Sequence, residues 1–160
     1  MAYQKLQTYR ALPVVYSDTI NIPNIMTLVS GGTNTAVTVN KLEDTTAGHS
    51  FITDNVKTGD IVMNTTTNTI ATVTAVDSAT VLSLSADIFL ATPNNYSIFP
   101  NDNNGCVLYI GGAGNIRVLT TGEDDVTFTG VLAGTYFPVQ VLRVYATGTT
   151  VAANTINALW

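Results

Sequence analysis

Alternation of β-branched residues with small or apolar ones governs what this chain can fold into. Thr69–Val76, with the sequence TIATVTAV, repeats with a period of two residues, which is typical of a strand with one buried face. The chain contains 27 Thr and 18 Val but only two Glu and three Lys. β-branched residues favour strands, whereas Glu and Lys are among the usual helix formers. The sequence therefore predicts an all-β fold.

Two clusters of turn-forming residues delimit a middle block of the chain. The first is Ser30-Gly31-Gly32, and the second runs from Pro100 to Gly105. Several short strands between such clusters favour a small barrel or sandwich. We therefore expect residues 31–100 to form an inserted, barrel-like β module. Its expected strands are Thr35–Asn40, Phe51–Thr53, Asp60–Asn64, Thr69–Val76, Val81–Leu84 and Tyr96–Phe99.

Residues 101–160 have the pattern of an antiparallel meander or sandwich sheet. The glycine-rich segment GGAGN, residues 111–115, predicts a hairpin turn in which glycine supplies positive φ angles. Residues 1–30, with two prolines, are expected to be extended. They form either an arm that lies on other subunits or an edge strand with a loop. The strands expected in the C-terminal block are residues 106–110, 116–120, 126–131 and 138–146, with a last one near 154–160.

The expected strand at residues 138–146 is apolar on both sides. Odd-numbered positions from Val139 to Tyr145 would share one face, and even-numbered positions from Gln140 to Ala146 the other. A strand with no clearly polar face is expected to be covered by other parts of the protein on both sides. Ile156, Ala158 and Trp160 also alternate toward one face, so either the same subunit or a neighbour covers the tryptophan.

The low charge of the chain indicates that other subunits cover part of its surface. Only 11% of the residues are charged, beside 46% hydrophobic ones, and the net charge is −5. A monomer of this size normally carries more charge for solubility. We therefore expect a closed homo-oligomer. The residues expected at its interface are Val141, Arg143, Tyr145, Ile156, Leu159 and Trp160.

The composition also argues against several partners. The six Lys and Arg residues are scattered, so we expect no basic surface for nucleic acid. No apolar run approaches ~20 residues, so we expect no membrane span. The first residues lack the basic-then-apolar order of a signal peptide, so we expect no secretion by that route.

No catalytic site, metal site or cofactor is expected. His49, the only histidine, is predicted to be a solvated loop residue, and Cys106 a small core residue, so a Cys–His pair is not favoured. Zinc would need more His and Cys ligands. GGAGN precedes a strand pattern rather than the helix of a phosphate-binding loop. The acidic loops 101–104 and 123–125 are predicted to be solvated turns, with calcium binding as the alternative.

Several short motifs lie in the C-terminal block. They are a strand that ends in a glycine pair (Leu108–Gly112), AGT-x-x-PV-x-V-x-RV (Ala133–Val144), ATGTT (Ala146–Thr150) and a final ALW (Ala158–Trp160). In this combination the block resembles the tail of a family of tailed-phage virion proteins, which includes the head-spike base proteins of gene transfer agents and related phages. The segment Ser17–Asn24 is similar to the N-terminal part of such proteins.

The resemblance implies a non-enzymatic virion structural protein, located on the capsid exterior as a spike base or a decoration protein. It implies a three-fold or five-fold homo-oligomer that contacts other virion proteins, the major capsid protein among them. Residues 31–100 have no counterpart in the compact spike bases, so a neck or tail component is an alternative. A host-surface-binding β module is another, with Tyr96 beside Asn94 and Asn95 as its one hint. We expect residues 101–160 to anchor and oligomerise the protein and residues 31–100 to project.

Overall fold

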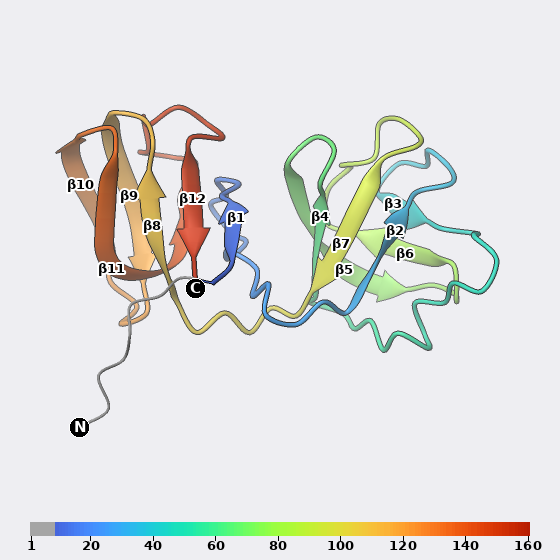
Figure 1. Ribbon diagram of the computed structural model, residues 1–160. Helices are drawn as coiled ribbons and strands as arrows, with labels where there is room; N and C mark the ends of the chain where they lie inside the picture. The colour runs from blue at the N-terminus through green and yellow to red at the C-terminus, as the bar shows by residue number, and fades with distance from the viewer. Residues whose placement is uncertain (1–8) are drawn as a thin grey trace, which may run out of the picture. The chain divides into compact units, whose positions relative to one another are not determined.

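The computed structural model describes residues 9–160, which form two compact β units (Figure 1). The first unit combines the chain up to Ile22 with Asn104–Trp160, and the second is Pro23–Asn103. Within the described residues every strand pair is antiparallel and no helix occurs. The predicted all-β class is therefore confirmed.

The sheet of the first unit does not follow the order of the sequence. Its strand order is β1-β12-β8-β11-β9-β10. Because β11 lies between β8 and β9, the predicted hairpin at residues 111–115 is wrong. A Cβ added to Gly111 would lie 2.8 Å from Thr155 O, so this glycine permits a close backbone approach. The strands are β1 (Ala11–Pro13), β8 (Cys106–Ile110), β9 (Gly114–Thr120), β10 (Asp125–Val131), β11 (Thr135–Val144) and β12 (Ile156–Leu159).

Strand β11 departs from the predicted alternation. Val141 and Val144 are both fully buried in the core of the first unit, although they are three residues apart. The pairing of β11 with β9 shifts register between Val141 and Arg143, as in a β-bulge. The extra residue turns Val144 to the same side as Val141. The predicted division of residues 138–146 into two alternating faces is therefore wrong.

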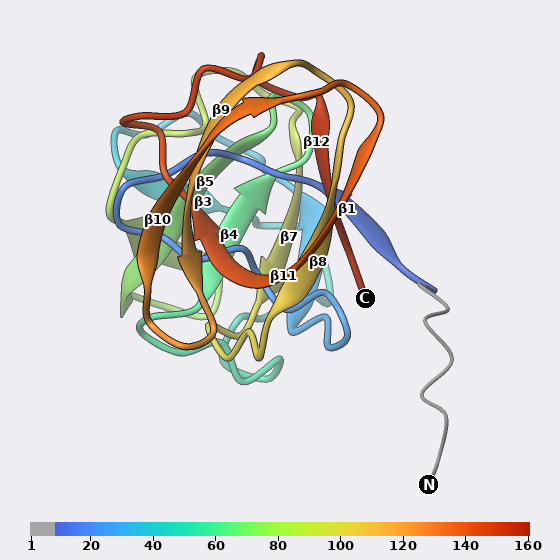
Figure 2. The same cartoon turned by 90° about the vertical axis from the view of Figure 1, so that its left-hand side faces the viewer.

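Residues 9–22 pack on the sheet of their own chain (Figure 2). Strand β1 pairs with β12, and the segment that follows donates backbone hydrogen bonds from Ser17 to Val144 O and from Ile22 to Leu142 O. Ile22 is buried in the core of the first unit. The edge strand with a loop is thus the description that fits residues 9–22, and residues 1–8 of the predicted arm lie outside the described residues.

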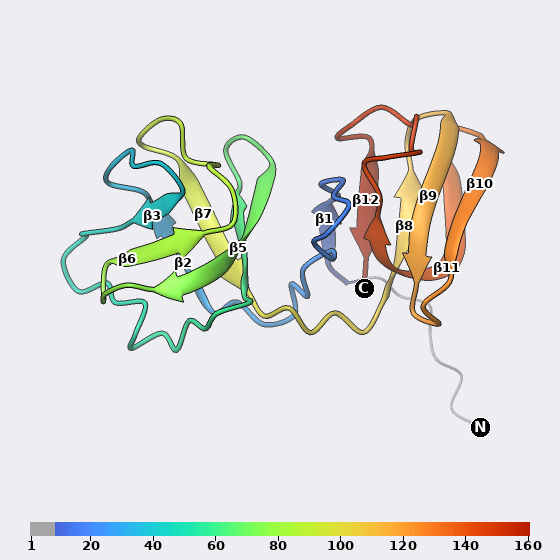
Figure 3. The same cartoon turned by 180° about the vertical axis from the view of Figure 1, so that it is seen from behind.

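The second unit is a curled sheet with the order β2-β7-β4-β5-β6-β3. The first part of β5 pairs with β4 and its last part with β6, with a register shift at Val73–Ala75. Figure 3 shows β5 and β6 side by side. Thr35 N donates to Glu43 O, which brings the chain after β2 next to β3, at the other end of the strand order. The sheet therefore curls toward a barrel. The strands are β2 (Ser30–Thr33), β3 (Lys41–Glu43), β4 (Ile61–Asn64), β5 (Thr69–Val76), β6 (Val81–Leu84) and β7 (Asn95–Phe99).

Two strands predicted for the middle block are wrong. Phe51–Thr53 is part of a turn, closed by hydrogen bonds from Asp54 N to Ser50 O and from Val56 N to Phe51 O. Its apolar character comes from Phe51, which is fully buried and fixes the loop to the core. Thr35–Asn40 is a loop that ends in a turn at Asn40, where φ is 55°. The Ser30-Gly31-Gly32 cluster, predicted to be a breaker, is part of β2.

The terminal tryptophan is held by its own chain. Trp160 N donates to Arg10 O, and Tyr9 N donates to Trp160 O, so the β1–β12 ladder extends to the last residue described. The indole packs against the core cluster of the first unit, in which Ile156 and Ala158 are fully buried. The predicted alternation of these three residues toward one face is confirmed, and the same subunit supplies cover for Trp160.

We predict that Trp160→Ala lowers the free energy of unfolding of the first unit by about 2 kcal/mol, because the variant loses apolar contacts with the core. Amide hydrogen exchange of β8 and β12 measures this without a tryptophan signal. The matched control is Leu132→Ala in the same unit, which removes a side chain that is 71% exposed. Equal effects of the two substitutions would contradict the packing role of Trp160.

Candidate functional site

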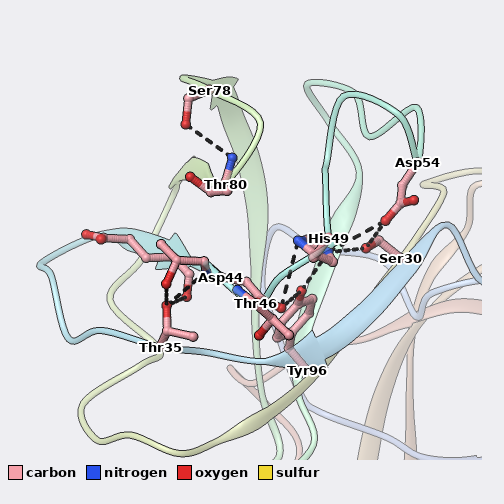
Figure 4. Close-up of polar contacts among 11 residues, drawn as sticks. Ser30, Thr35, Asp44, Thr46, His49, Asp54, Ser78, Thr80 and Tyr96 are labelled. Carbon is pink, nitrogen blue, oxygen red and sulfur yellow. Dashed lines mark hydrogen bonds and ion pairs between the residues drawn. The ribbon is translucent and has the colours of Figure 1, made fainter.

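A cluster of largely buried polar side chains connects β2, β7 and the loop after β3 in the second unit (Figure 4). Ser30 comes from β2, Asp44 directly follows β3, and Tyr96 comes from β7. His49 and Asp54 come from the loop between β3 and β4. Ser30, Asp44 and Tyr96 are buried, and the His49 side chain is only 12% exposed. Buried polar groups need hydrogen-bond partners, so the directions of their hydrogen bonds decide what the cluster can do.

The two hydroxyl groups of the cluster both donate to carboxylates. Tyr96 Oη donates to Asp44 Oδ2 over 2.7 Å, and Ser30 Oγ donates to Asp54 Oδ2 over 2.7 Å. His49 Nε2 lies 3.1 Å from Tyr96 Oη and 3.2 Å from Ser30 Oγ. Both hydroxyl hydrogens are already donated to carboxylates, so the hydroxyl oxygens can only accept from His49. Nε2 must therefore carry a proton and donate to these oxygens.

This arrangement leaves the other imidazole nitrogen without a hydrogen bond. His49 Nδ1 is buried, finds no hydrogen-bond partner among residues 9–160, and lies 3.9 Å from Asp44 Oδ2. The ring packs edge-on against Phe51, with ring centroids 4.5 Å apart. The prediction of a solvated loop histidine is therefore wrong, because its loop folds back over the core.

The cluster contains Ser, His and Asp, but its hydrogen bonds do not run in the directions that nucleophilic catalysis needs. A catalytic serine donates its proton to Nε2 of a histidine whose Nδ1–H is held by a carboxylate. Here Nε2 is the donor, Ser30 donates to Asp54, and Nδ1 lies 3.9 Å from Asp44 Oδ2, too far for a hydrogen bond. His49 in this tautomer cannot accept the proton of Ser30. The hydrogen bonds of the cluster instead connect β2, β7 and the loop after β3, and so stabilise the fold of the second unit.

The ionisation states of Asp44 and Tyr96 support the same conclusion. Burial acts to raise the pKa of Asp44, but hydrogen bonds from Thr46 and Tyr96 together outweigh it and hold the pKa below 3.8. Burial, followed by the hydrogen bond to Asp44, raises the pKa of the Tyr96 phenol. At neutral pH the pair is thus a carboxylate that accepts from a neutral phenol, which is a strong charge-assisted hydrogen bond.

A pocket of about 380 Å³ adjoins the cluster through Asp54. Its lining also includes Lys57, Asp60 and Asp102. Burial raises the pKa of Asp60, whose carboxylate accepts from Lys57 N. No group of three or more His, Cys, Asp or Glu side chains is arranged to hold a metal ion in the part of the chain that is described.

The acidic loops predicted as solvated turns have partners within the protein. In the first loop Asp102 accepts from Asn24 Nδ2 over 3.2 Å. In the second loop Asp125 accepts two N–H groups of Arg117, over 2.8 and 2.7 Å. Intramolecular hydrogen bonds therefore use part of the oxygen ligands that a calcium ion would need.

The structure distributes the six residues expected at an oligomer interface over different environments. Val141 and Ile156 are fully buried in the core of their own unit, so they have no surface to offer a partner. The Arg143 guanidinium donates to Asn21 Oδ1 and Asp18 O. The remaining three, Tyr145, Leu159 and Trp160, are partly exposed.

The sequence analysis did not predict the exposed tyrosines on the outer face of the sheet in the first unit. Tyr109 of β8 pairs with Tyr136 of β11, and the two side chains are 42% and 38% exposed. Leu108 and Ile110, the neighbours of Tyr109, are fully buried on the opposite face. Tyr109 interrupts the apolar run CVLYI at a position that the period of two assigns to the outer face, which is the signal that could have found it.

Two further expectations concern Tyr96 and Cys106. Tyr96 is buried, so it cannot form the exposed binding platform that a host-surface module would need. Cys106 is buried in the core of the first unit and its Sγ donates to Val141 O, whereas His49 belongs to the second unit. The predicted core role of Cys106 is confirmed. Residues 9–160 include no helix with the length and apolar character needed to cross a bilayer.

We predict that Gly32→Ala destabilises the second unit by about 1–3 kcal/mol, because the cluster has no room for an extra atom. A Cβ at this position would lie 2.6 Å from Asp44 Oδ2 and 3.0 Å from Tyr96 Oη. Hydrogen exchange of β4 and β7 measures the change. Gly122→Ala, followed by the exchange of β9 and β10 in its own unit, is the control, because its Cβ would meet no atom closer than 3.4 Å. An unchanged exchange rate in the Gly32 variant would contradict the tight packing of the cluster.

We predict that Asp44→Asn lowers stability at pH 7 by about 1–3 kcal/mol, because it weakens the hydrogen bonds of a buried carboxylate. The pKa of Asp44 is lowered from 3.8, so its contribution is present above that value and is lost as the pH falls through the lower folded-state pKa. Chemical unfolding at pH 7 and pH 3 should therefore show a smaller deficit at pH 3. Asp60→Asn is the control, because burial raises that pKa and the change should not destabilise at pH 7.

Comparison of the chain with protein-family models, curated proteins and solved structures finds no match.

Proposed function

We propose that the chain is a non-enzymatic structural protein of a tailed-phage particle. Its place is the capsid exterior, as a head-spike base or a decoration protein, in a homo-oligomer of three-fold or five-fold symmetry. Its other partners are virion proteins, the major capsid protein among them. The support for the phage assignment is the combination of the Ala133–Val144, Ala146–Thr150 and Ala158–Trp160 motifs in one block.

The observation that carries the homo-oligomer is the apolar outer face of the first unit. Two tyrosines, Tyr109 and Tyr136, are exposed side by side in a chain of which only 11% is charged. Exposed apolar patches of this kind mark interaction sites, and tyrosine is enriched in interfaces. A protein whose task is to assemble needs such a face, whereas an enzyme needs a cleft with convergent reactive groups.

The C-terminal motifs of the resemblance all belong to the first unit. Ala133–Val144 contains the whole of β11, and Ala158–Trp160 contains the last two residues of β12 and the residue that follows it. In Ala146–Thr150, two threonine hydroxyls accept from the backbone of β9: Thr149 from Arg117 N and Thr150 from Asn115 N. This clustering supports a division of labour in which the first unit oligomerises and anchors the protein and the second unit projects.

The hydrogen-bond directions of the His49 cluster support the absence of enzymatic activity. Ser30, His49 and Asp44 together have the composition of a hydrolytic triad. His49 donates to Ser30 Oγ instead of accepting from it, and the hydroxyl proton goes to Asp54. The cluster thus stabilises the second unit and does not serve as a reaction centre.

The proposal predicts that the purified chain forms a closed homo-oligomer and that antibodies to it label intact particles on the capsid. Sedimentation at micromolar concentration measures the first, and negative-stain microscopy of antibody-labelled phage particles the second. Label at the neck or tail would replace the capsid location with the alternative virion position. Particles that carry no label, together with a monomer in solution, would refute the proposal.

A further inference from the structure

We propose that β10, an edge strand of the first unit, pairs with residues 1–8 of a second copy of this chain, which add to the six-stranded sheet as a seventh strand. We call residues 1–8 the arm. The inference rests on the homo-oligomer of the proposed function. It names the contact that gives the assembly its direction, which the exposed tyrosines alone do not.

Strand β10 has an edge whose backbone groups pair with no other strand in the described part of the chain. It lies at one end of its sheet and pairs with β9 only. Thr120 N of β9 donates to Asp124 O, whereas Arg117 O of β9 accepts from Tyr145 N on the opposite side. In an antiparallel ladder every second residue bonds to a given neighbour. Thr127, which lies opposite Arg117, therefore directs its N–H and C=O away from β9.

The other edge of the sheet is protected, and β10 is not. Strand β1 has only three residues and includes Pro13, which has no N–H. The next residue, Val14, donates to Ile156 O, so position 13 is one that faces outward from the ladder. Short strands, prolines and lysines are the usual protection of an edge. Strand β10 has seven residues and contains neither Pro nor Lys, and an edge of this kind takes up a strand from another chain.

Charge favours the arm as the strand that is added. Glu123 and Asp124, directly before β10, are exposed, and neither forms an ion pair within the described residues. The arm contains Lys5 and no Asp or Glu, so its charge has the opposite sign. Opposite charges across an interface fix its register and speed up association. In a chain whose net charge is −5, an acidic turn would instead repel most other segments of a second copy.

The length and composition of the arm also fit β10. Eight extended residues span about 26–29 Å, and the seven residues of β10 span about 24 Å. The arm can therefore pair along the whole strand. It contains no proline, so its residues can donate backbone N–H groups to the ladder.

The position of the arm in the chain agrees with a ring. The arm directly precedes Tyr9, whose N–H donates to Trp160 O beside β1, at the opposite end of the strand order from β10. A contact between two different surfaces of identical chains is heterologous, and such contacts close into rings when the rotation permits. Three-fold and five-fold rings are of this kind. Pairing of β10 with a second β10 would instead give a two-fold pair.

The first test blocks the outward backbone group of β10 in the full-length chain. Thr127→Pro removes the outward N–H and leaves the hydrogen bonds to β9 in place, since proline is tolerated at such edge positions. Thr127→Val keeps the N–H and the β-branched shape and is the matched control. Sedimentation across a concentration series measures association, and circular dichroism checks the fold. We expect association at least about tenfold weaker in the proline variant and unchanged in the valine variant.

The second test exchanges the charges of the two partners. Lys5→Glu and Glu123→Lys should each weaken association, because each brings like charges together. The chain that carries both substitutions keeps the net charge of the natural sequence and should associate nearly as that sequence does. A double variant no better than the single ones would contradict the contact between the arm and the start of β10.

Cross-linking remains informative if the proline variant fails to fold. In a Cys106→Ala background, one chain carries Lys5→Cys and another carries Thr127→Cys, and a short bis-maleimide joins thiols that lie close together. We expect a product of the two different chains. Tyr109→Cys replaces Thr127→Cys in the control, which should give no such product. A product that joins two chains through position 127 of each would show self-pairing of β10 and overturn the inference.

The remaining outcomes separate this inference from the proposed function. An oligomer that survives Thr127→Pro, without a product between positions 5 and 127, overturns the role of the arm and leaves the homo-oligomer in place. A chain with cysteines at both positions that cross-links within itself as a dilute monomer shows that its own arm covers β10, and also overturns the inference. A natural chain that is monomeric at every concentration overturns both proposals.

Discussion

The register shift in β11 is the constraint on which the first unit depends. One strand of ten residues, Thr135–Val144, pairs with β8 along its first part and with β9 along its last part. The shift at Val141–Arg143 directs Val141 and Val144 into one core and leaves Val144 O free to accept from Ser17 N. The same part of β11 also holds the segment that follows β1, because Ile22 N donates to Leu142 O.

The second unit depends on a different kind of interaction. Its sheet is closed by polar groups as well as apolar ones: the Tyr96–Asp44 hydrogen bond connects β7 to the end of β3, and Ser30 connects β2 to the loop at Asp54. A buried network of this kind specifies one arrangement when every member is satisfied. Here one atom, His49 Nδ1, is not satisfied within the described residues. The packing of the ring against Phe51 holds it in place despite that cost.

The parts of the fold that sequence could predict are those decided by local chemistry. Strands β5 and β6 end at the predicted residues, because the turn Asp77–Thr80 joins two alternating runs that pair with each other. Strand order in the first unit could not be predicted, since β11 inserts between β8 and β9 through contacts distant in sequence. Strand β2 was not predicted, because its residues Gly31 and Gly32 are more typical of turns than of strands. His49 could not be placed either, because its partners Ser30, Asp44 and Tyr96 meet only after the sheet has curled.

The pairing of β1 with β12 has a consequence for the order of events during synthesis on the ribosome. The second unit, Pro23–Asn103, is continuous in the chain, so it can fold as soon as it has left the exit tunnel. The first unit cannot, because the partner of β1 is made only after all the other strands. The nascent segment that contains Val14 and Ile22 must therefore wait with its apolar side chains uncovered. Folding of the second unit in the meantime shortens the effective loop between the two halves of the first unit and lowers the entropic cost of closing it.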